Sequence, residues 1–159
     1  MLLLKIPDVK SAMNTLLTTN SFDNFLVSEI TIVNSVTYNI DGHIVDADDK
    51  DNAVSLMTYE KLRPIVLDMI KGNKTPSYMK FVLTLSPENI ANTAKSIGSN
   101  TNASGITGMY LNIVFQNGNL NITTGVAYRT FMKDVTLEKE WDRLVPIFLS
   151  KSGIACENL

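Results

Sequence analysis

The chain has 159 residues with a formal net charge of −2, and 45% of the residues are hydrophobic. This length and apolar content fit one folded domain and exclude wholesale disorder. No apolar run approaches the roughly 18 residues of a membrane span, and the start of the sequence lacks a secretory signal, so we expect a cytoplasmic protein without a membrane partner.

The first half of the chain predicts a strand, a helix, a β-hairpin and a second helix. Pro7-Asp8 suits a helix start, because an aspartate carboxylate accepts hydrogen bonds from the free N–H groups of a first turn. Apolar residues alternate on both sides of Asn34-Ser35, which is typical of a hairpin, and Gly42 indicates a bulge or bend. The expected elements are a strand over 2–6, a helix over 8–17, strands over 25–33 and 36–44, and a helix from a Thr58 cap to Gly72.

The second half predicts the same order of elements. Ser86-Pro87-Glu88 combines an N-cap serine, a proline at the first helical position and an acid in the first turn. Asn117-Gly118 is the strongest hairpin turn in the chain, because both residues tolerate positive φ. The expected elements are a strand over 79–85, a helix over 86–97 ended by Gly98, strands over 109–115 and 120–131, and a helix over 136–149 capped by Thr136.

The two halves also match in sequence at a constant offset of 82 residues, at which the helix prolines Pro64 and Pro146 coincide. A proline inside a helix costs about 3 kcal/mol, so its recurrence favours duplication over two unrelated amphipathic helices that follow unrelated hairpins. We therefore expect one α+β domain over 1–159, built from pseudo-symmetric halves 1–76 and 77–159. Its mostly antiparallel sheet would carry the helices on one face.

The residue counts restrict catalysis and metal binding. His43 is the one histidine and Cys156 the one cysteine, whereas a zinc site needs about three or four clustered ligands, so we expect no metal and no cofactor. Asp41 and His43 share a strand face at i and i+2, which suits an acid–base pair; the alternative is a surface histidine. The acidic run 46–51 has lysine and aspartate where a calcium loop needs an oxygen ligand and glycine, which favours a solvated loop over a cation site.

Basic residues gather around the end of the second predicted helix. Residues 61–80 hold five bases and one acid, and Arg63, Lys71, Lys74 and Lys80 are candidate anion-binding residues. The alternative is that these lysines complement the negative end of a helix dipole before a Gly/Asn/Pro turn. A phosphate-binding P-loop is excluded, because the basic turn follows a helix rather than a strand.

Four segments of the chain carry a resemblance to a known family. They are Leu62-Arg63-Pro64-Ile65, Ile70-Lys71-Gly72-Asn73-Lys74-Thr75-Pro76, Lys80-Phe81 and Leu85-Ser86-Pro87-Glu88. Together they resemble a family of small uncharacterised proteins from Firmicutes, and the resemblance runs over most of the chain. Because that family has no assigned activity, the resemblance implies a bacterial cytoplasmic setting and no particular chemistry.

A second resemblance is architectural. The strand–helix–strand–strand order that Met79-Lys80-Phe81-Val82 opens and Asn117-Gly118-Asn119-Leu120 continues is similar to a DNA sliding-clamp domain. This resemblance implies internal twofold symmetry, with a sheet outside and helices inside. The predicted helices carry eight bases and seven acids, and such a near-neutral face supplies few phosphate contacts, so the charge pattern argues against DNA binding.

These observations favour a non-enzymatic binding or scaffold module with a clamp-like fold, because the sequence offers no catalytic constellation. Its partner would be an unknown protein or a second copy of the chain. One alternative is an anion or nucleic-acid binder that uses the basic turn from Lys71 to Lys80. The other is a small enzyme that uses His43 with Asp41.

Overall fold

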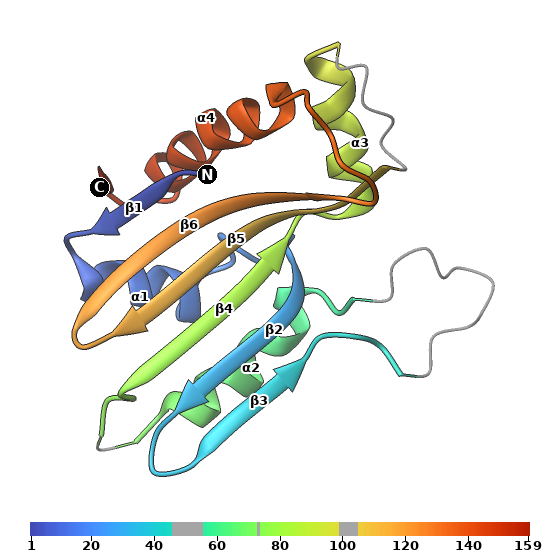
Figure 1. Cartoon of the computed structure of the whole chain (residues 1–159). Helices are drawn as coiled ribbons and strands as arrows, with labels where there is room; N and C mark the ends of the chain where they lie inside the picture. Colours follow the sequence, from blue (N-terminus) through green and yellow to red (C-terminus); the bar gives the residue numbers. More distant parts are fainter. Residues whose placement is uncertain (46–55, 73, 99–104) are drawn as a thin grey trace.

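The computed structural model describes residues 1–45, 56–72, 74–98 and 105–159, which form a seven-stranded sheet and four helices (Figure 1). The strands are β1 (Leu3–Ile6), β2 (Leu26–Val33), β3 (Thr37–Asp41), β4 (Tyr78–Thr84), β5 (Ile106–Gln116), β6 (Asn119–Tyr128) and β7 (Glu157–Asn158). The helices are α1 (Val9–Thr18), α2 (Tyr59–Ile70), α3 (Pro87–Ser96) and α4 (Thr136–Lys151). The strand order is β3-β2-β4-β5-β6-β1-β7, and all the neighbours are antiparallel. The predicted α+β class is therefore confirmed.

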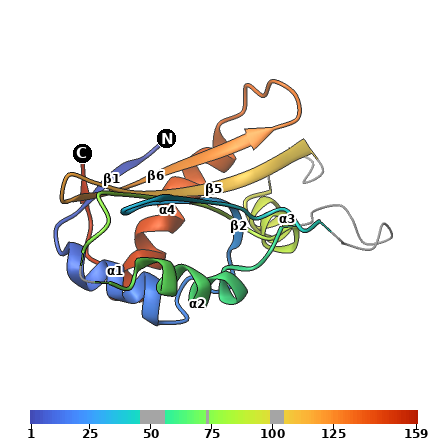
Figure 2. The same ribbon diagram turned by 90° about the horizontal axis from the view of Figure 1, so that it is seen from below.

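The sheet has one covered face and one open face. Met79, Phe81 and Leu83 of β4 alternate along the strand and are buried on the side where α1, α2 and α4 lie (Figure 2). On the opposite side stand polar residues such as Asn112 and Asn121, which the two-residue period of a strand turns away from the core. An antiparallel sheet tolerates such one-sided cover because its second face is polar enough for water. Within the described residues, no helix is long and apolar enough to cross a membrane.

Most of the predicted local structure is confirmed. Asp8 caps α1 by accepting a hydrogen bond from the Ser11 N–H at 3.1 Å, and Ser86 caps α3 in the same way. Asn117 and Gly118 both have positive φ, at 53° and 75°, as their hairpin turn requires.

Two predicted caps need correction. Thr58 stands before α2, but its side chain makes no capping hydrogen bond, and its buried hydroxyl has no partner among the described residues. Thr136 lies inside α4, and the carboxylate of Asp134 accepts from the Thr136 N–H at 2.9 Å. The sequence pattern predicts a threonine cap for both helices. At the start of α4, the side chain that accepts from the backbone is instead that of Asp134, two residues before Thr136.

One strand prediction also needs correction, and one short strand lacks a prediction. The strand predicted over 36–44 ends at Asp41, because the Gly42 carbonyl then accepts a hydrogen bond from the N–H of Met57 at 2.8 Å and the chain leaves the ladder. β7, which pairs with β1, was not predicted, since two residues are too few to show a period.

The strand order does not repeat the two predicted halves. β1 pairs with β6, whereas β4, its predicted counterpart, lies between β2 and β5. Pro64 and Pro146 do both lie inside helices, and strands from both halves share one hydrophobic core. The internal duplication and the clamp-like arrangement are therefore not confirmed.

Gly42 is required by the close approach of two backbones. A Cβ atom at this position would lie 1.7 Å from the carbonyl oxygen of Val27, which a side chain cannot displace because it belongs to β2. The same stretch of β2 also holds the segment before α2, since the Val27 N–H donates to the Met57 carbonyl at 2.8 Å. A side chain at Gly42 would thus disturb the strand end and the entry to α2 together.

We expect Gly42→Ala to lower the free energy of unfolding by about 3 kcal/mol, because overpacking against backbone cannot relax through side-chain rotamers. Urea denaturation followed by circular dichroism measures this change. The matched control is Gly125→Ala on β6, where an added Cβ meets nothing within 4 Å. The control should be neutral or stabilising by up to about 1 kcal/mol, and an equal loss in both variants would contradict the backbone argument.

Candidate functional site

Arg63, a predicted anion-binding residue, belongs to an internal ion pair. Its Nε and Nη2 donate to the two carboxylate oxygens of Asp23 at 2.8 and 2.9 Å. Asp23 is only 8% exposed, and its hydrogen bonds raise the pKa of the Arg63 guanidinium above its ordinary value. Because a bidentate pair of this kind is directional, it ties the segment before β2 to α2. Arg63, which is partly buried, is thus already engaged by a carboxylate of the protein itself.

The three predicted lysines lie in different places. Lys71 follows α2, with its Nζ 3.8 Å from a carboxylate oxygen of Asp68, and both side chains are exposed. Lys80 lies on β4, on the open face of the sheet, with its Nζ 3.6 Å from Glu29. Lys74 lies in the turn between α2 and β4 and lines a hollow on the helix side. The structure therefore does not assemble the four residues into one anion site.

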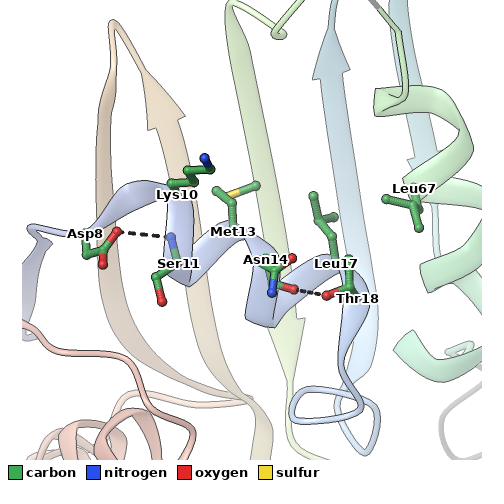
Figure 3. A pocket seen from close by; sticks show the side chains of 8 residues that line it. All are labelled: Asp8, Lys10, Ser11, Met13, Asn14, Leu17, Thr18 and Leu67. Carbon is green, nitrogen blue, oxygen red and sulfur yellow. Dashed lines mark hydrogen bonds between the residues drawn. The ribbon is translucent and has the colours of Figure 1, made fainter.

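The hollow beside Lys74 adjoins a second one along α1, because Lys10, Met13 and Leu17 line both. Their volumes are about 540 and 520 Å³. In Figure 3, the Lys10, Met13 and Leu17 side chains lie along one side of α1, and Leu67 approaches from α2. We call the combined hollow the α1–α2 groove. Its lining comprises Asp8, then Val9, Lys10, Ser11, Met13, Asn14, Leu17 and Thr18 of α1, Leu67 and Ile70 of α2, Gly72, Lys74, Thr75 and Pro76 of the turn, and Met79 and Phe115 of the sheet.

The groove follows from the antiparallel packing of α1 and α2. At one end, the buried Tyr59 hydroxyl at the start of α2 donates to the Leu16 carbonyl near the end of α1 at 2.9 Å. At the other end, Val9 and Lys10 at the start of α1 face Ile70 and the turn that follows α2. Burial raises the pKa of Tyr59, so its hydroxyl stays a neutral donor.

The groove combines an apolar floor with a basic rim. Met79 and Phe115 form a buried floor, while Met13 is only partly buried at its wall. Lys10 and Lys74 are exposed at the rim, and neither makes an ion pair with any residue in the described part of the chain. Such a surface suits a ligand with an apolar side and a negative charge.

Sequence reasoning found Lys74 but missed Lys10. The sequence places Val9, Met13 and Leu17 on one apolar face of the helix, a pattern typical of a face that packs on the core. The one sequence signal for a binding surface is Met13, which lies on the apolar face three residues after Lys10. Methionine is common on adaptable binding surfaces. That signal becomes specific only when α2 leaves Met13 partly uncovered.

The predicted acid–base pair does form. The Nδ1 atom of His43 lies 2.5 Å from Oδ1 of Asp41, and the same oxygen accepts from the His43 N–H at 3.0 Å. These hydrogen bonds, the backbone one first, lower the pKa of Asp41. Both side chains are exposed, beside a shallow hollow of about 360 Å³ that Ser28 and Glu29 also line. The contact with Asp41 uses the Nδ1 atom of His43, so a ligand would have to interact with the Nε2 atom.

Among the residues that the structure describes, no group of three or more histidine, cysteine, aspartate or glutamate side chains is placed to hold a metal ion. The acidic run 46–51 lies outside the described residues. Burial raises the pKa of the Cys156 thiol, which keeps it in the less reactive protonated form.

Comparison with known proteins gives one match. A family model described as a family of unknown function (DUF5721) matches residues 15–157. No curated protein and no solved structure matches the chain. The match confirms the expected resemblance to a family without an assigned activity, and it shows neither a Firmicutes origin nor a likeness to sliding clamps.

We expect Arg63→Met to cost about 2–3 kcal/mol of stability, because it leaves the carboxylate of Asp23 buried without its partner. The matched control is Lys71→Met, which removes an exposed pair in the same region and should cost less than about 0.5 kcal/mol. Chemical denaturation of both variants measures the difference. Asp23→Leu combined with Arg63→Leu should recover part of the loss, since no charge then remains unpaired. Equal losses in the two methionine variants would show that the Arg63 pair has no structural role.

Proposed function

The chain belongs to this family of unknown function, DUF5721, and we propose that it is a non-enzymatic binding module whose ligand is an acidic, amphipathic helix of a partner protein. The α1–α2 groove is the docking site. The observation that supports this proposal is the combination of a buried apolar floor, Met79 and Phe115, with the lysines Lys10 and Lys74 at the rim.

The shape of the groove favours a helix over a slimmer ligand. α1 has 10 residues and is therefore about 15 Å long, which matches two to three turns of a docked helix. An acyl chain would leave much of its surface in water, because Met13 and Lys10 stand at the open side of the groove. A helix about 10 Å wide covers both walls and places apolar residues at i, i+3, i+4 and i+7 on the floor.

The charge of the rim favours an acidic partner. Asp8 also borders the groove, but its carboxylate already accepts a hydrogen bond from the N–H of Ser11 and serves as the cap of α1. Lys10 and Lys74 still outnumber this one carboxylate, so the charged residues that line the groove sum to +1. Of the four predicted anion-binding residues, Lys74 alone lines this groove. The second lysine at its rim is Lys10 of α1. We place this function in the cytoplasm, for which the single cysteine is the supporting observation.

We expect a synthetic helical peptide with glutamates beside its apolar stripe to bind the groove, and the same peptide with lysines in those places to bind less. Methyl resonances of Met13 and Met79 should shift in NMR titrations. Lys10→Glu combined with Lys74→Glu should weaken binding of the acidic peptide about tenfold, because attraction becomes repulsion at two positions. The matched control, Lys95→Glu with Lys139→Glu on α3 and α4, should leave it unchanged. Equal binding of both peptides, or shifts outside the groove, would refute the proposal.

A second candidate function is a small hydrolytic enzyme that uses His43. The supporting observation is the hydrogen bond between Asp41 and Nδ1 of His43, because it orients Nε2 as a general base. The exposure of both side chains weighs against it, since an efficient active site excludes water.

We expect His43→Ala to change the free energy of unfolding by less than about 0.5 kcal/mol, because the side chain is exposed. We also expect no His43-dependent turnover of nitrophenyl esters or nitrophenyl phosphates by the unmodified protein. Absorbance assays of the unmodified protein, of His43→Ala and of Asp41→Asn measure this directly. Turnover that both substitutions abolish would favour the enzyme over the binding module.

A further inference from the structure

The two ends of the sheet differ in how much backbone they expose. β7 closes one end with two residues, Glu157 and Asn158, and a short edge of this kind offers few hydrogen bonds. β3 forms the other end with five residues, Thr37–Asp41, and no described strand pairs with its outer side. β3 also lacks proline and lysine, with which proteins commonly block an edge.

The hydrogen-bond register shows which backbone groups point outward. The Gly42 N–H donates to the Ser28 carbonyl, and the Asn34 N–H donates to the Val36 carbonyl. In an antiparallel ladder the bonded pairs alternate, so Tyr38 and Ile40 direct their backbone groups toward β2. The N–H and C=O groups of Thr37, Asn39 and Asp41 therefore face away from the sheet. In agreement, the carbonyl of Val33, which is opposite Thr37, accepts from Ser77 on the far side of β2.

These outward groups are complementary to themselves. If two copies of β3 pair antiparallel around a twofold axis at Asn39, each Thr37 lies opposite an Asp41 and the two Asn39 residues face each other. In each of these pairs, the residue of one copy and the residue of the other copy would exchange two N–H···O=C hydrogen bonds. No two like charges stand opposite each other, which would destabilise the pairing.

The side chains on the helix side of the edge fit the same register. Tyr38 of each copy would lie opposite Ile40 of the other copy. Aromatic side chains pair favourably with β-branched ones across strands. Tyr38 is 37% exposed, and on α2, which covers this part of the sheet, Ile65 is 49% exposed (Figure 1). Val36, at the hairpin turn, is 54% exposed. The edge thus has apolar surface that a second copy would cover.

We propose that a second copy of this chain pairs with β3 edge to edge, so that a twofold dimer has one continuous sheet. The interface is isologous, because the same five residues supply both sides. β3 contributes no residue to the α1–α2 groove, so this dimer neither depends on the proposed docking function nor blocks it.

Sedimentation equilibrium of the full chain tests the proposal with three variants at one position. Asn39→Pro removes an outward N–H that bonds to no residue in the described part of the chain, so it should abolish the dimer and leave the folded monomer intact. Asn39→Lys places two like charges opposite each other and should weaken the dimer about fivefold at low salt. Asn39→Thr keeps the N–H and should stay dimeric. Circular dichroism reports whether each variant is folded.

Hydrogen exchange gives an independent test on the unmodified protein. The amides of Thr37, Asn39 and Asp41 should become more protected as the protein concentration rises, while that of Tyr38 should be protected at every concentration. A monomer at the highest soluble concentration would overturn the proposal. So would a dimer that Asn39→Pro and Asn39→Lys leave unchanged, because the contact would then lie elsewhere.

Discussion

The hydrogen bond from the Tyr59 hydroxyl to the Leu16 carbonyl is the contact on which the arrangement of α1 and α2 depends. Tyr59 is fully buried, and leaving its hydroxyl without an acceptor would cost about 1–3 kcal/mol. The bond therefore holds the start of α2 against the end of α1, while the Asp23–Arg63 pair holds the next turn of α2. With the helices joined at this end, their other ends meet at the turn before β4. The α1–α2 groove lies along this contact.

The same one-sided construction explains why the groove and the β3 edge are separate surfaces. The helices cover one face of the sheet, and the polar residues of the other face need no cover. In the described part of the chain, the gap between α1 and α2 and the ends of the sheet are two places that suit association. The groove offers apolar side chains and lysines, which suit a helix, whereas β3 offers backbone groups, which suit another strand. A dimer through β3 would present two grooves, which would increase the avidity for a partner with two docking helices.

Clustered charge in a sequence is a weak guide to a binding site, as the basic residues of this chain illustrate. Arg63, Lys71 and Lys80 each have a carboxylate partner within 4 Å, and three different carboxylates are involved. Lys10, far from them in the sequence, lines the same hollow as Lys74 because the start of α1 lies near the end of α2. Whether a charge can meet a ligand thus depends on its partners in the folded state rather than on its neighbours in the chain.

Local chemistry was enough to determine most elements of the fold. The period of two in β5 and β6, the Asn117-Gly118 turn and the Ser86 cap are properties of a few adjacent residues, so they could be predicted from the sequence alone. The hydrogen bond between Asp41 and His43 was predictable for a similar reason, because it joins residues two apart in the chain. The pairing of β4 between β2 and β5, the Asp23–Arg63 ion pair and the groove could not be predicted in this way. They join residues that are distant in the chain, and only the burial of the common core decides which of the compatible arrangements forms.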